Sequence, residues 1–124
     1  MNFSVMAQPG PEFLLIEAQG LMDLGDLCGM FDLAARVCEM NGHRRVLLDL
    51  LEVHVDLAFT QHLTLGKHAA TSLVRLERAA SVVSPAERRG TSEKSAQKHG
   101  LRFRTFTDLA EGRIWIAERQ GPLL

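Results

Sequence analysis

The spacing of hydrophobic and polar positions changes several times along the chain, and each change marks the edge of a predicted element. Five short apolar segments predict strands, at residues 3–8, 12–19, 45–50, 78–84 and 101–106. A Pro9-Gly10-Pro11 turn separates the first two. Such a short link favours an antiparallel hairpin, because parallel neighbours need a long crossover. The third segment is apolar almost throughout, which is typical of a central parallel strand covered on both faces.

Four other segments predict helices. They run from Asp23 or Asp26 to Asn41, from Phe59 to about Leu76, from Thr91 to His99, and from Thr107 to Arg119. The third is polar and is predicted from Gly100 as the residue that ends it. The second of these helices has one apolar face, made of Phe59, Leu63, Gly66, Ala70, Leu73 and Val74. The element order is β-β-α-β-α-β-α-β-α. We therefore predict a single α/β domain over residues 1–124, with a mixed, mostly parallel five-stranded sheet and about four helices.

The composition is typical of a soluble globular domain and does not indicate a particular partner. Apolar residues make up 46% and charged residues 23% of the 124 residues, as in an ordinary soluble globular domain. Cys28 and Cys38 lie ten positions apart on one predicted helix, hence about 15 Å apart and too distant for a disulfide. No signal peptide is recognisable, and no apolar run approaches the roughly 20 residues of a membrane helix. We expect a cytoplasmic protein without membrane insertion.

Charge is unevenly distributed although the net charge is only −1. The first 42 residues are acidic, whereas residues 85–104 are rich in arginine and lysine. A nucleic-acid surface would combine such bases with stacking aromatics. Phe103 and Phe106 alternate with polar residues on a strand and are expected in the core, so we predict no nucleic-acid partner. A solvated basic face and a docking face for an acidic partner both remain open.

Three segments carry a resemblance to a known family. They are the strand Leu47–Leu50 with its following loop and long helix, the strand Ala79–Ser84, and the closing stretch 102–116 with Phe106, Gly112, Trp115 and Ile116. In this order they resemble the SpoIIAA-like branch of the STAS superfamily (sulphate transporter and anti-sigma-factor antagonist domains). The resemblance implies a small mixed sheet with helices on its faces, and a first strand that runs against the others.

The same resemblance directs attention to a missing hydroxyl. Phosphorylated antagonists of the superfamily carry an Asp-Ser-Ser-Gly-like motif, whose serine sits at the N-terminus of the helix after the third strand. Leu57, Ala58 and Phe59 stand at the corresponding positions here. Thr60 follows one residue later and is more typical of a first-turn residue than of a substitute. A phosphate-switched antagonist role is therefore not carried over.

The loop after the third strand is nevertheless the candidate site, because open α/β sheets keep their function at the carboxyl ends of strands. Its surface comprises Val53, His54, Val55, Asp56, Leu57, Ala58, Phe59 and Thr60. Our leading hypothesis is a non-enzymatic binding or regulatory module that uses this surface for a protein partner. The alternative is a carrier of a small lipid-like ligand, with Val53, Val55, Leu57 and Phe59 lining a hydrophobic pocket.

A third hypothesis is a metal-dependent hydrolase built on His54, Asp56 and His62. Two histidines and an aspartate match the ligand chemistry of zinc. No spacing in the chain demands such a site, since His62 and His68 are six residues apart and diverge on a helix. We predict no catalytic residue, no metal and no cofactor.

A second apolar row on the first predicted helix points to self-association. Met30, Leu33, Val37 and Met40 repeat at i, i+3, i+7 and i+10, beside the row that faces the sheet. A deeply packed helix would use both rows, and a homodimer contact would use the second. Both interpretations remain open, and homodimerisation is the prediction that can be tested.

Overall fold

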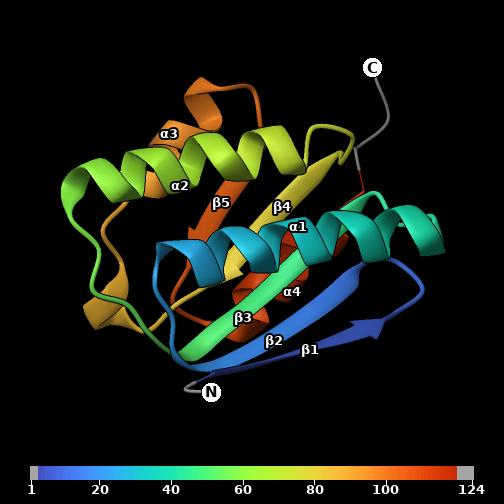
Figure 1. The fold of residues 1–124 in the computed structure, drawn as a ribbon. Coiled ribbons are helices and arrows are strands. Elements are labelled where there is room, and N and C mark those ends of the chain that lie inside the picture. The colour runs from blue at the N-terminus through green and yellow to red at the C-terminus, as the bar shows by residue number, and fades with distance from the viewer. Residues whose placement is uncertain (1–2, 120–124) are drawn as a thin grey trace.

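A computed structural model describes residues 3–119 and shows one twisted five-stranded sheet (Figure 1). The strands are β1 (Phe3–Pro9), β2 (Leu14–Leu21), β3 (Arg45–His54), β4 (Arg78–Val82) and β5 (Phe103–Phe106). They lie side by side in the order in which they occur along the chain. The β1–β2 pair is antiparallel and all other pairs are parallel. The predicted mixed, mostly parallel sheet with a reversed first strand is therefore confirmed.

The helices cover the two faces of the sheet unequally. They are α1 (Leu24–Asn41), α2 (Phe59–Ser72), α3 (Thr91–Lys98) and α4 (Leu109–Ala117), with a 3₁₀ turn at Pro85–Glu87. The first three lie on one face, where α2 runs between α1 and α3, and α4 alone packs on the other (Figure 1). None of the helices within residues 3–119 is long and apolar enough to cross a membrane.

Local sequence explains both ends of α1. The Asp23 side chain accepts a hydrogen bond from the Asp26 amide at 2.8 Å, and the Asp26 side chain accepts one from the Asp23 amide at 3.0 Å. This reciprocal pair satisfies two amides that the first turn leaves free. At the other end Gly42 takes a left-handed conformation with φ of 74°, which glycine adopts at little cost. The predicted start and stop of this helix are confirmed.

Strand β3 separates two cores. Val46 and Leu48 face the side of α1 and are fully buried, whereas Leu47 faces α4 and packs with Trp115 and Ile116. A β-carbon on Gly112 would lie only 2.8 Å from Cγ2 of Val82. The small residue in the closing stretch therefore lets α4 approach the sheet closely.

Several boundaries differ from the prediction. Helix α2 ends at Ser72 instead of about Leu76, and β4 ends at Val82 instead of Ser84. Strand β3 continues to His54 instead of ending at Leu50, and β5 begins at Phe103 instead of Leu101. Helix α4 is capped by Asp108 and not by Thr107, because the Asp108 carboxylate accepts the Glu111 amide at 3.2 Å. Aspartate is as good an N-cap as threonine or better, and the neighbouring residues gave no reason to prefer one.

The apolar face predicted for α2 is only partly buried. Gly66, Ala70 and Leu73 are buried as expected, but Phe59, Leu63 and Val74 are 63%, 41% and 73% exposed. The cause is the close contact with α3, where a β-carbon on Gly66 would overlap the Ser92 carbonyl oxygen and lie 2.9 Å from the Ala96 amide nitrogen. This contact rotates the helix so that Leu65 and Ala69 enter the core and Phe59 turns outward.

Candidate functional site

The segment after the buried part of β3 alternates between the interior and the solvent. The inward residues are Val53, which is 4% exposed, and the half-buried Val55 and Leu57. The exposed residues are His54, Asp56, Ala58, Phe59 and Thr60. The predicted surface is thus divided between two different environments, one inside the fold and one outside it.

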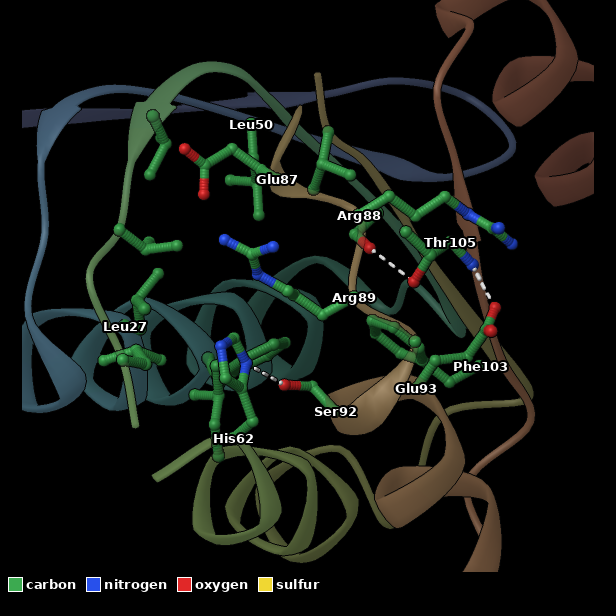
Figure 2. A pocket seen from close by; sticks show the side chains of 18 of the residues that line it. Leu27, Leu50, His62, Glu87, Arg88, Arg89, Ser92, Glu93, Phe103 and Thr105 are labelled. Carbon is green, nitrogen blue, oxygen red and sulfur yellow. Dashed lines mark hydrogen bonds between the residues drawn. The ribbon is translucent and has the colours of Figure 1, made fainter. Parts of the chain in front are cut away.

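The inward side chains line a cavity of about 90 Å³ at the carboxyl end of the sheet (Figure 2). Leu27, Met30 and Phe31 of α1 form one wall, and Leu50, Val53, Val55 and Leu57 form another. Val83 and residues 87–90, from the connection between β4 and α3, line its outer side. A pocket near residues 53–59 was predicted, and three of its four predicted lining residues are present. Phe59 is not among the residues that line it.

Polar groups gather at the mouth of this cavity. Nδ1 of His62 and Oγ of Ser92 share a hydrogen bond of 3.0 Å between α2 and the first turn of α3. Figure 2 shows the Arg89 side chain extending across the mouth, toward the space between Glu87 and His62. On the far wall the Glu93 carboxylate accepts the Thr105 amide at 2.5 Å. The cavity therefore has apolar walls and a polar rim.

Burial lowers the pKa of His62, and the positive charge of Arg89 lowers it further, while Glu87 acts in the opposite direction. The imidazole is therefore neutral near pH 7, with one donor nitrogen and one acceptor nitrogen. The neutral ring suits its bond to a serine hydroxyl, which can donate or accept. Because the His62 ring is neutral, the positive charge next to it at the mouth of the cavity is that of Arg89.

A second, open depression lies between α2 and α3. This groove of about 550 Å³ contains the side chains of Phe59 and Leu63 from α2. Its basic lining residues are Lys67, Arg89, Lys94, Lys98 and His99, and none of its lining residues is a carboxylate. Arg89 and Gly90 also line the cavity, so this dipeptide separates the two regions.

Comparison with known proteins gives the fold its name. No family model and no curated protein matches the chain. The solved structures of similar shape include an anti-sigma factor antagonist from Mycobacterium paratuberculosis, with a TM-score of 0.64 and 14% identity over 94% of this chain and 95% of that one. An uncharacterised DUF3478-family protein from Shewanella loihica PV-4, described as having a SpoIIAA-like fold, gives a TM-score of 0.55 and 19% identity over 93% of both chains. The chain has a SpoIIAA-like fold.

The start of α2 has no hydroxyl-bearing residue at its N-cap. Ala58 is the N-cap, and it has no side-chain oxygen to offer the first turn. Instead, Oε1 of Gln61 accepts the Ala58 amide at 2.9 Å. Thr60 is exposed at the second position of the helix. No serine hydroxyl is present at this helix start, as expected from the sequence. The helix therefore begins with two apolar residues, Ala58 at the N-cap and Phe59 at the first position.

The hydrolase hypothesis finds no geometric support. His54 and Asp56 are exposed, whereas His62 is turned toward Ser92. Among residues 3–119, no group of three or more His, Cys, Asp or Glu side chains is arranged to hold a metal ion. The alternation along β3 explains this, because it sends residues 54 and 56 to the side opposite the cavity.

The proposed dimer row on α1 is divided in the same way. Met30 is 2% exposed and belongs to the core, and Val37 is half-buried, whereas Leu33 and Met40 are 42% and 73% exposed. Only the last two are available for a contact between chains, so homodimerisation stays a prediction. If it is correct, static light scattering will give twice the monomer mass for the wild type and the monomer mass for Leu33→Lys. A monomeric wild type would contradict it.

Sequence reasoning missed Arg89 and Ser92. Both lie in the basic stretch whose sequence pattern indicated only a solvated or acidic-partner face. Their position depends on the approach of α3 to α2 at Gly66, which is a contact between distant segments. The alternation of Val53, Val55 and Leu57 with polar residues was the one local signal available for the cavity.

Proposed function

We propose that this protein is a regulatory protein-interaction module that acts by binding and not by catalysis. Its docking surface is the groove between α2 and α3. The partner is a protein segment that is acidic and carries at least one large apolar side chain. The SpoIIAA-like fold supports this class of function, since one of the solved neighbours is an anti-sigma factor antagonist.

One observation carries the proposal: two exposed apolar side chains lie among four bases. Phe59 is 63% and Leu63 is 41% exposed. Lys67, Arg89, Lys94 and Lys98 share the groove with them. Aromatic side chains in a desolvated depression are typical hot spots of protein interfaces, and charges at the rim select the partner and speed its association.

The set of side chains in the groove also favours a protein partner over a nucleic acid. Phe59 is the only Phe, Tyr or Trp among the described residues that line the groove, and His99 carries the one other ring there. Single-stranded nucleic acids are usually held by several stacking platforms along a basic track. A groove with one aromatic and one aliphatic anchor better fits an acidic helix or strand with apolar side chains at its centre.

A site-specific photocrosslinker tests the proposal in cells of the source organism. One variant carries p-benzoylphenylalanine in place of Phe59. The matched control carries it in place of Ile114, which is 69% exposed on α4 at the opposite face of the sheet. We expect a protein crosslinked from position 59 and not from position 114. Its crosslinked peptide should contain several acidic residues and an apolar one.

Purified partner then gives the decisive measurement. Phe59→Asp should weaken binding at least tenfold, with an unchanged circular dichroism spectrum, and Ile114→Asp should leave the affinity unchanged. The proposal fails if both variants bind the partner like the wild type. It also fails if position 59 crosslinks to nucleic acid instead of protein.

A further inference from the structure

The cavity behind Arg89 differs from a simple packing defect in having a cation at its mouth. Its walls are formed by aliphatic and aromatic side chains of α1, the end of β3, α2 and β5. An engineered apolar cavity of about 150 Å³ remains dry and takes up benzene. A cavity of about 90 Å³ is large enough for a short aliphatic tail.

Arg89 has no carboxylate partner within residues 3–119. The ion pairs formed by this part of the chain are Arg45–Glu77 at 2.6 Å and His68–Asp32 at 2.8 Å. Glu87 lies near the rim but makes no ion pair with Arg89. Arg88 points away from the centre of the cavity, whereas Arg89 reaches across it (Figure 2).

We propose that this cavity binds a short-chain monocarboxylate, with its aliphatic tail against Val53, Val55 and Leu57 and its carboxylate on the guanidinium of Arg89. The hydroxyl of Ser92, within the same rim, can donate a further hydrogen bond to the carboxylate. Of the two arginines that line the cavity, only Arg89 reaches across its mouth, and Glu87 lies on the same rim. One guanidinium beside a carboxylate suits a singly charged carboxylate better than a doubly charged phosphate monoester. The guanidinium of arginine binds a carboxylate through two parallel N–H···O hydrogen bonds.

Chain length and head group provide the first test. The purified protein, without any partner, is titrated with sodium acetate, sodium butanoate and 1-butanol while the methyl resonances of Val53, Val55 and Leu57 are followed by NMR. Sodium chloride at equal concentration controls for ionic strength. Each added methylene should raise the affinity about fourfold if the tail enters the cavity. Butanoate should therefore bind about fifteenfold more tightly than acetate, and more tightly than 1-butanol.

A pair of adjacent arginines provides the second test. Arg89→Gln should weaken butanoate binding about tenfold and leave 1-butanol binding unchanged. Arg88→Gln is the matched control, and it should have no effect on either ligand. Both residues are exposed, so both variants should fold. The proposal is overturned if butanoate shifts these methyl groups no more than sodium chloride does, or if Arg89→Gln and Arg88→Gln bind butanoate equally. Because no partner is present, this result is independent of the proposed docking function.

Discussion

The cavity and the groove lie on opposite sides of the same dipeptide, Arg89-Gly90, and they differ in nearly every physical respect. The cavity is small and apolar, and the β4–α3 connection borders its mouth. The groove is about six times larger, open and basic. Residues of α2 and α3 line both. The comparison shows that one pair of neighbouring helices can border an interior site and an exterior surface together.

The two regions also depend on different periodicities. The cavity wall follows the period of two along β3 and its extension, which sends Val53, Val55 and Leu57 inward. The groove follows the helical period of α2, which places Phe59 and Leu63 one turn apart on the exposed side. The change between the two periods falls at Ala58, the N-cap of α2. A substitution at Val55 or at Phe59, on either side of this point, should therefore affect one region alone.

The largest loss of stability should come from Gly66→Ala, because this change disturbs the contact between α2 and α3, which border both regions. The new methyl group would meet backbone atoms of Ser92 and Ala96, and backbone atoms cannot move aside as a side chain can. We expect a loss of about 3 kcal/mol in the free energy of unfolding, despite the better helix propensity of alanine. Urea denaturation followed by circular dichroism measures it.

Gly29→Ala is the matched control for this change. It lies in the middle of α1, and its β-carbon would meet no atom within 4 Å. This variant should gain up to about 1 kcal/mol of stability from helix propensity alone. If Gly66→Ala is as stable as Gly29→Ala, the close contact between α2 and α3 does not exist as described.

The next largest effect on stability should distinguish the two regions when an aspartate is introduced into each of them in turn. Val55→Asp places a carboxylate against the apolar cavity wall and should cost about 2 kcal/mol of stability. Phe59→Asp places it on an exposed helix start and should change stability by less than about 0.5 kcal/mol. Urea denaturation of both variants checks this. Equal losses of stability would show that Phe59 packs into the fold and does not belong to an open groove.

A smaller effect, on binding only, should come from charge reversal in the groove. Lys94→Glu should weaken the binding of the crosslinked partner about tenfold at low salt. It should also make the association rate of that partner less dependent on salt. Arg113→Glu, on the exposed side of α4, should leave both unchanged. Isothermal titration and stopped-flow association measure the two quantities. An equal loss from Arg113→Glu would indicate a general charge effect and not a docking surface.

These comparisons show how far the sequence alone leads. The strand Val46–Leu48, the capped helix that follows Asp23 and the turn at Gly10 were all predictable, because each depends on residues close together in the chain. The rotation of α2 was not predictable, since it depends on the meeting of Gly66 with Ser92. The end of β3 at His54 was not predictable either, since residues 52–54 are held in the strand by pairing with residues 19–21 of β2.

The smallest effect concerns the rim of the cavity and appears only as a dependence on pH. The pKa of His62 is lowered in the folded protein by burial and by Arg89. The unfolded chain, whose histidines titrate near pH 6.5, therefore takes up the proton first as the pH falls. The contribution of neutral His62 to stability is complete above about pH 6.5 and is lost progressively below it.

His62→Gln should remove this part of the pH dependence. We expect the wild type to lose more stability than His62→Gln between pH 7 and pH 5, as measured by urea denaturation at both values. His54→Gln, which changes an exposed histidine at the end of β3, should lose as much as the wild type. If His62→Gln retains the full pH dependence of the wild type, the His62 ring is solvated in the folded protein. In that case the rim of the cavity is as open as the groove, and the contrast between the two regions disappears.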